Sequence, residues 1–208
     1  MLRFHDYVLS DSCYKVRLLL GLLGLDHVRQ PVDYYPGREH LQPRFRTLSP
    51  LGEMPVLEDD GLVLWGAEAV LCHLANAHDR SGRWLPREAE AFGPVMMWLA
   101  FAAGKLQALS KARETALFGA EGDLNAMRRQ GRAALRVLED HLTDRGLAGG
   151  TWIVGETATI ADIAAFPAVA LSHDCGIGLE DYPALDLWQR RVRSLPGFVS
   201  MAGIPDYF

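Results

Sequence analysis

This chain of 208 residues lacks several features that would identify a function at once. It has only three cysteines, Cys13, Cys72 and Cys175, and their spacing fits neither a metal site nor a disulfide framework. No uncharged run approaches the roughly 18 residues of a membrane span. The N-terminus carries Arg3 and His5 within its first apolar stretch, which is untypical of a signal peptide. These features predict a protein of the reducing cytoplasm without a membrane segment.

An excess of charge of one sign is also missing. The formal net charge is −5, and the acidic residues are scattered rather than clustered. Such a surface offers no basic face, so we expect no nucleic-acid partner and no anionic membrane partner. With 49% hydrophobic and 23% charged residues, the composition is that of an ordinary globular protein.

Hydrophobic periodicity and turn residues divide the first 79 residues into a compact pattern of strands and helices. A strand over residues 2–7, a helix over 14–23 and a strand over 27–34 form a β-α-β start. A polar segment follows, and then two short strands joined by an Asp60-Gly61 hairpin turn. A helix over 67–77 ends this unit, so residues 1–79 are predicted to have the order βαβ-α-ββα.

The rest of the chain has no comparable strand pattern. Residues 80–86 have the composition of a linker, and residues 87–208 are predicted to form an all-helical domain. Apolar residues at helical spacing predict four helices in this domain, over 88–109, 124–142, 160–170 and 183–194. The fold class is therefore an α/β domain followed by an all-α domain.

The turn before Pro55 is the most informative stretch for function. Proline before a Val-Leu strand indicates a sharp turn, because its nitrogen has no hydrogen to donate to a sheet. If the Met54–Pro55 bond is cis, the backbone of Met54 is exposed at the sheet edge and can pair with an extended, peptide-like ligand. The helix that begins after Trp65 offers its N-terminus to a ligand carboxylate.

Several motifs, taken together, resemble the cytosolic glutathione transferases along essentially the whole chain. They are Leu9-Ser10-x-x-Cys13-Tyr14-Lys15-Val16-Arg17, Leu48-Ser49-Pro50-Leu51-Gly52-Glu53-Met54-Pro55-Val56-Leu57, Gly155-x3-Thr159-Ile160-Ala161-Asp162 and Leu195-Pro196-Gly197-Phe198. The resemblance implies a thioredoxin-like N-terminal domain, an α-helical C-terminal domain and a homodimer. It also implies glutathione as co-substrate, with no metal.

The same resemblance places the sulfur of glutathione at the loop after the first strand. A hydroxyl or amide there donates a hydrogen bond to the thiolate and lowers the pKa of the thiol, helped by the helix N-terminus. Ser10 matches the catalytic serine of theta-like members, and Ser12 matches an asparagine position of other bacterial members. Either serine could instead only cap the helix. Cys13 matches a cysteine that forms mixed disulfides in some relatives, or is simply a buried core residue.

Further residues are assigned to the rest of glutathione by the resemblance. His40 matches a position that holds the glycine carboxylate, with a solvated loop histidine as the alternative. Met54 pairs its backbone with the cysteinyl residue at the Pro55 turn. Gly66 and Ala67 stand where the family has Glu-Ser or Gln-Ser to hold the γ-glutamyl end, so two polar contacts are missing. Glu68 is one residue late and would point about 100° away on a helix.

The acceptor pocket of the family lies between the two domains. Met97, Phe101 and Lys105 share a helix face beside Trp98, and they either line that pocket or belong to the core. The predicted reaction is attack of the glutathione thiolate on a small apolar electrophile. The missing contacts at Gly66 and Ala67 leave two alternatives, a family member with another thiol or conjugate as ligand and a non-catalytic dimeric binding protein.

Overall fold

The structure is a computed structural model, and residues 1–204 are described here. The first part of the chain has the predicted order of strands and helices, with a short 3-10 turn before the second helix. Its elements are β1 (Arg3–Asp6), α1 (Asp11–Leu22), β2 (Val28–Pro31), η1 (Glu39–Leu41), α2 (Pro43–Arg46), β3 (Val56–Asp59), β4 (Leu62–Trp65) and α3 (Ala67–His78). This thioredoxin-like arrangement confirms the predicted fold of the first part.

The four strands form one mixed sheet in the order β2-β1-β3-β4. β1 runs parallel to β2 and antiparallel to β3, and β3 and β4 form the predicted hairpin. Successive side chains of a strand point to opposite faces. On β1, Phe4 belongs to the core that α1 and α3 complete, whereas the ring of His5 lies edge-on to Phe45 of α2. The helices α1 and α3 therefore cover one face of the sheet, and α2 covers the other.

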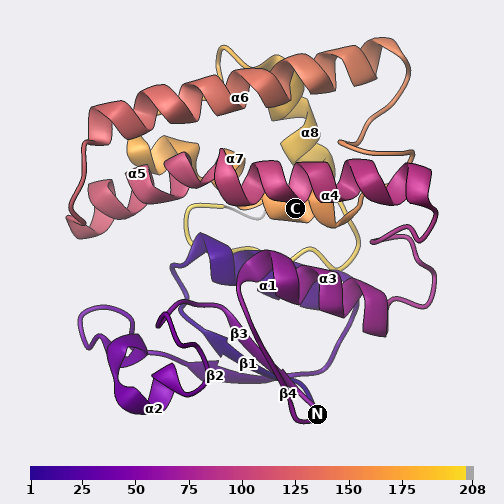
Figure 1. Cartoon of the computed structure of the whole chain (residues 1–208). Helices are drawn as coiled ribbons and strands as arrows, with labels where there is room; N and C mark the ends of the chain where they lie inside the picture. The colour runs from indigo at the N-terminus through magenta and orange to yellow at the C-terminus, as the bar shows by residue number, and fades with distance from the viewer. Residues whose placement is uncertain (205–208) are drawn as a thin grey trace.

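The second part of the described chain is helical, as predicted. It contains α4 (Ala89–Gly104), α5 (Gln107–Phe118), α6 (Leu124–Leu147), α7 (Ile160–Ala170), η2 (Ser172–Cys175) and α8 (Pro183–Arg193). Every residue of α7 is buried, and Figure 1 shows α1 and α3 between the sheet and these helices. One hydrophobic core runs from Phe4 and Tyr14 to Phe166 and Trp188, so it joins the two parts of the chain. None of the described helices is both long enough and apolar enough to cross a membrane.

The predicted helix over residues 88–109 is wrong in one respect. The chain forms two helices there, because α4 ends at Gly104 and α5 begins at Gln107. Glycine lowers helix stability by its backbone entropy, and Leu106 in the intervening turn is directed into the core, with 1% of its surface exposed. The sequence pattern also missed the last nine residues of α5, 110–118, and ended α6 five residues early, at 142 instead of 147.

The turn before β3 has the predicted conformation, since the Met54–Pro55 peptide bond is cis. Gly52 precedes it with a φ of +67°, in the left-handed region that favours glycine. A Cβ atom at Gly52 would lie 2.7 Å from the carbonyl oxygen of His40. Only glycine therefore allows the η1 segment to approach the Pro55 turn this closely.

Candidate functional site

A cleft of about 440 Å³ lies where α1, the Pro55 turn and the N-terminus of α3 meet the helices α4 and α5. All the predicted site residues except Cys13 and Pro55 line it, namely Ser10, Ser12, His40, Met54, Gly66 and Ala67. A larger hollow of about 780 Å³ lies between α7 and α8, and none of the predicted residues lines that hollow. The smaller cleft is therefore the candidate site.

Ser10 is the N-cap of α1. Its backbone is extended, and its Oγ accepts a hydrogen bond from the backbone N–H of Cys13 at 3.1 Å. Capping uses the hydroxyl as an acceptor, so its own hydrogen remains available to donate to a ligand. The two roles weighed for this serine, a helix cap and a donor to sulfur, are compatible in one side chain.

The other two candidates of this loop differ in their access to the cleft. Ser12 lines the cleft one helical position after Asp11, whose Oδ1 accepts from the Ser12 backbone N–H at 2.7 Å. Cys13 has no exposed surface, and its burial raises the pKa of the thiol to about 12. A buried, protonated thiol is a poor nucleophile, so the geometry favours the core role for Cys13.

Met54 and His40 form the wall of the cleft beside the Pro55 turn. No hydrogen bond joins the backbone N–H or C=O of Met54 to another residue within 1–204. The imidazole of His40 stacks on the ring of Tyr34 with centroids 4.0 Å apart, and its Nδ1 is buried without a hydrogen-bond partner in this part of the chain. Burial, with the charges of Arg38 and Arg46, lowers the pKa of His40 and favours the neutral ring.

Gly66 and Ala67 open α3 at the opposite wall of the cleft. Gly66 has a φ of +89°, a conformation that other residues adopt at a cost, but a Cβ there would meet no heavy atom within 4 Å. Ala67 is the first residue of α3 and is buried. The positive end of the α3 dipole therefore faces the cleft with no polar side chain at either position.

Glu68, expected to point elsewhere, does line this cleft. Its Oε1 lies 2.8 Å from Nζ of Lys15 on α1, and 27% of the Glu68 side chain is exposed, against 8% for Lys15. A carboxylate and an ammonium thus lie together beside Gly66 and Ala67. Pattern reasoning missed this pair because Lys15 and Glu68 are 53 residues apart in the sequence.

The sequence left open whether the residues singled out on α4 line the acceptor pocket or belong to the core, and none of them lines the cleft. Met97 is 59% exposed and Trp98 is core, while Phe101 and Lys105 lie in a separate groove against α6. The cleft instead receives the next residues, Ala102 and Ala103. Because α4 ends at Gly104, the residues from Gln107 onward belong to α5. This helix lines the cleft where a continued α4 was expected.

Aromatic rings and charged side chains also line the cleft. The ring of Tyr7, which follows β1, lies 5.4 Å from that of Tyr34 and 6.4 Å from that of Phe118, measured between centroids. Arg113 and Glu114 also line the cleft, and burial raises the pKa of Glu114. Sequence analysis missed these residues, and it placed Tyr7 inside the first strand, which ends at Asp6.

Comparison with known proteins shows which family both parts of the chain match. The chain matches the family profile "Glutathione S-transferase, N-terminal domain" over residues 9–77 and "Glutathione S-transferase, C-terminal domain" over residues 105–191. It is similar to maleylacetoacetate isomerase of Rattus norvegicus, with 24% identity over 93% of this chain and 88% of the relative. It is also similar to the disulfide-bond oxidoreductase YfcG of Escherichia coli, with 29% identity over 90% of this chain and 88% of the relative.

A solved structure gives the same result at the level of the fold. The crystal structure of glutathione S-transferase from Pseudomonas fluorescens superimposes with a TM-score of 0.85 and 30% sequence identity. The match covers 96% of this chain and 98% of that one. The similarity therefore extends over both the sheet-containing part and the helical part.

Proposed function

The chain belongs to the glutathione S-transferase family, and from that premise we propose that it binds glutathione in the cleft beneath α4 and α5 and ionises its thiol. The thiolate then attacks a small, largely apolar electrophile, and Ser10 stabilises the sulfur by donating its hydroxyl hydrogen. No metal takes part in this reaction.

One observation carries the proposal. Ser10 caps α1 inside the cleft and accepts from the Cys13 N–H, so its hydroxyl hydrogen is free to be donated while the first turn of α1 lies directly behind it. A helix N-terminus favours a negative charge by about 0.3–1 kcal/mol, and a hydrogen bond to a charged acceptor adds about 1.5–3 kcal/mol. Together these terms can lower a thiol pKa by about one to three units.

The remaining walls suit the rest of the tripeptide. The backbone of Met54 can pair with the cysteinyl residue of glutathione, because no protein group competes for it in the described chain. His40 can donate to the glycine carboxylate from a neutral ring. The electrophile is assigned to the space beside Tyr7, Tyr34 and Phe118, whose rings offer apolar area.

The γ-glutamyl end needs a different account, since Gly66 and Ala67 offer no polar side chain. That end of glutathione carries an ammonium and a carboxylate, and Lys15 and Glu68 present the opposite charges at the same wall. We assign the γ-glutamyl end to these two residues and to the backbone at the start of α3. Their mutual ion pair must open to receive it, so glutathione binding is expected to be weak.

The two alternatives to this function are distinguishable. The relatives are named for different reactions, an isomerisation and a disulfide-bond oxidoreduction, so family membership does not fix the chemistry. The changes at Gly66 and Ala67 favour either a different thiol or conjugate as ligand, or a binding protein without catalysis. The first alternative predicts a site that rejects glutathione, and the second predicts a bound thiol that stays protonated.

A cytoplasmic homodimer is the proposed state of the protein. Apolar side chains are exposed on both parts of the chain, including Val63 and Trp65 on β4 and Phe92 and Met97 on α4. A contiguous apolar patch marks an interaction surface, and we propose that the partner protomer covers these side chains. The three cysteines are free thiols, which fits a reducing compartment.

Restoring the missing polar groups tests the site directly. The double substitution Gly66→Glu with Ala67→Ser should tighten glutathione binding, measured by isothermal titration calorimetry, by at least about 10-fold, or about 1.4 kcal/mol. The positive φ of Gly66 means that the double variant should also lose about 1–2 kcal/mol of unfolding free energy. No steric clash is expected, because the space around a Cβ at Gly66 is open.

Ala67→Ser alone is the matched control, since it adds the hydroxyl without backbone strain. It should tighten binding by part of the full effect and leave stability nearly unchanged. A double variant that folds but binds glutathione no better than the unmodified protein would contradict the assignment of the γ-glutamyl end to this wall. S-methylglutathione should show the same relative gain in affinity as glutathione in each variant, because it keeps every contact except that of the ionised thiol.

A further inference from the structure

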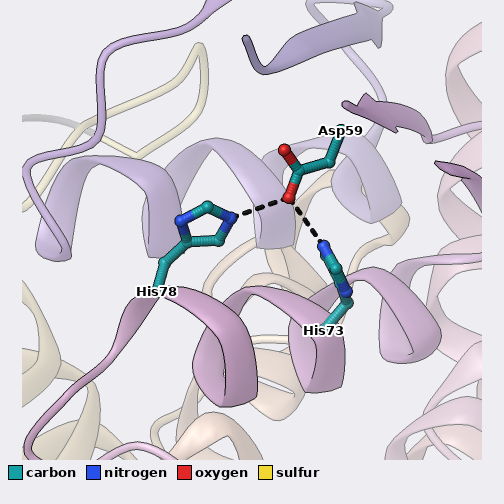
Figure 2. A group of neighbouring side chains, drawn as sticks. All are labelled: Asp59, His73 and His78. Atoms are coloured by element: carbon teal, nitrogen blue, oxygen red, sulfur yellow. Dashed lines mark hydrogen bonds and ion pairs between the residues drawn. The ribbon is translucent and has the colours of Figure 1, made fainter. Parts of the chain in front are cut away.

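Three side chains with metal-binding atoms converge away from the cleft. Asp59 is the last residue of β3, and His73 and His78 lie in the last two turns of α3. Nε2 of His73 is 2.9 Å from Oδ2 of Asp59, and Nε2 of His78 is 2.8 Å from the same oxygen. Figure 2 shows both rings pointing at that oxygen. The three atoms all lie within 4.8 Å of one another.

The surroundings hold these side chains in place. The exposed fractions of the side chains are 13% for Asp59, 21% for His73 and 26% for His78. The rings of His73 and His78 also contact each other edge-on, with centroids 6.0 Å apart. A partly buried group loses less conformational entropy on binding a ligand than an exposed one, so this cluster is preorganised.

The charge of the cluster is not balanced by a basic side chain. Within residues 1–204, the ion pairs of Asp59 are those with His73 and His78 alone, and no lysine or arginine joins them. The cluster therefore combines one carboxylate with two imidazoles, each of which offers one ligand atom. Such a group attracts a cation.

We propose that Asp59, His73 and His78 bind a divalent transition-metal ion, with Zn²⁺ as the preferred ion. Imidazole nitrogen and carboxylate oxygen are both zinc ligands, at bond lengths of about 2.0–2.2 Å, and two histidines with one carboxylate are a known zinc ligand set. Ligands of a tetrahedral ion at these lengths lie roughly 3.3 Å apart. Small side-chain rotations therefore suffice to admit the ion, and water completes its coordination.

The position of the site indicates a structural role. The ion would fasten the end of the β3–β4 hairpin to the C-terminal end of α3. The N-terminal end of α3, with Ala67, lines the cleft, and the 12 residues from Ala67 to His78 span about 16 Å along the helix. Metal binding should therefore stabilise the fold and leave the cleft unchanged.

Purified protein without an affinity tag, stripped by a chelator, tests the proposal. Titration with ZnCl₂ should give saturable binding of one ion per chain by calorimetry, and saturating Zn²⁺ should raise Tm by about 4 °C or more. Titration with Co²⁺ should give visible absorption bands of a tetrahedral site. The variant His73→Gln with His78→Gln should lose the binding, the bands and the shift in Tm.

His27→Gln is the matched control, because His27 is exposed and lies outside the cluster. It should bind Zn²⁺ as the unmodified protein does. Asp59→Asn, which keeps the shape of the side chain, provides a second variant should the double substitution fail to fold, and it should weaken Zn²⁺ binding at least 10-fold or so. Absence of saturable binding, or equal binding by the Asp59→Asn variant, would overturn the proposal.

Discussion

Replacing Asp162 by alanine should lower the free energy of unfolding by about 3–5 kcal/mol. Asp162 has no exposed surface, and its carboxylate accepts four hydrogen bonds. The donors are the backbone N–H of Ile153 at 3.1 Å, the backbone N–H of Thr159 at 2.9 Å, the Thr159 hydroxyl at 3.3 Å and Nε1 of Trp188 at 2.9 Å. Alanine would leave these donors buried without an acceptor, which costs about 1–3 kcal/mol for each group that cannot reach water.

Chemical denaturation followed by circular dichroism measures this loss. Asp123→Ala is the control, since Asp123 also caps a helix and accepts from the Ala126 N–H at 2.9 Å, but in an exposed position. That variant should lose only about 1 kcal/mol. Equal losses in the two variants would show that Asp162 acts as a cap alone and does not tie α7 to α8 and the Ile153 segment.

Replacing Ser10 by alanine should lower kcat/KM for glutathione conjugation by about 10–10³-fold, the scale of one charge-assisted donor. The loss should be in kcat, because the hydroxyl contacts the sulfur most strongly when it is ionised. Binding of S-methylglutathione should change little. Steady-state kinetics with a generic electrophile, together with calorimetry, separates the two effects.

Loss of the α1 cap is the competing explanation, because the Ser10 hydroxyl also accepts from the Cys13 N–H. Asp123→Ala removes a comparable cap at a residue that does not line the cleft, and it should leave kcat unchanged. Ser12→Ala tests the neighbouring hydroxyl, and a larger loss there than in Ser10→Ala would move the donor to Ser12. Cys13→Ala should affect stability more than activity, since the thiol is buried.

Local signals in the sequence were sufficient for most of the fold. The Thr159–Asp162 spacing predicted the start of α7, and both hydrogen bonds of that capping box are present. Pro55 predicted the turn and its cis bond. The break between α4 and α5 escaped prediction, because Gly104 alone is a weak signal and the buried position of Leu106 depends on tertiary packing.

The candidate site was predictable where it depends on the backbone or on motif spacing. Ser10, Met54 and Ala67 meet at one cleft as expected, because the thioredoxin-like topology brings their loops to the same edge of the sheet. Lys15 with Glu68, and Asp59 with His73 and His78, are long-range groupings. Their spacing carries no periodicity, so only the three-dimensional structure reveals them.

The ionisation of bound glutathione tests the central claim most directly. The far-ultraviolet absorbance of the thiolate, titrated against pH with the protein saturated, gives the pKa of the bound thiol. We predict a value at least one unit or so below the free cysteine value of about 8.5, and a return toward it in Ser10→Ala. A bound thiol that titrates at or above the free value in the unmodified protein would contradict the proposed function.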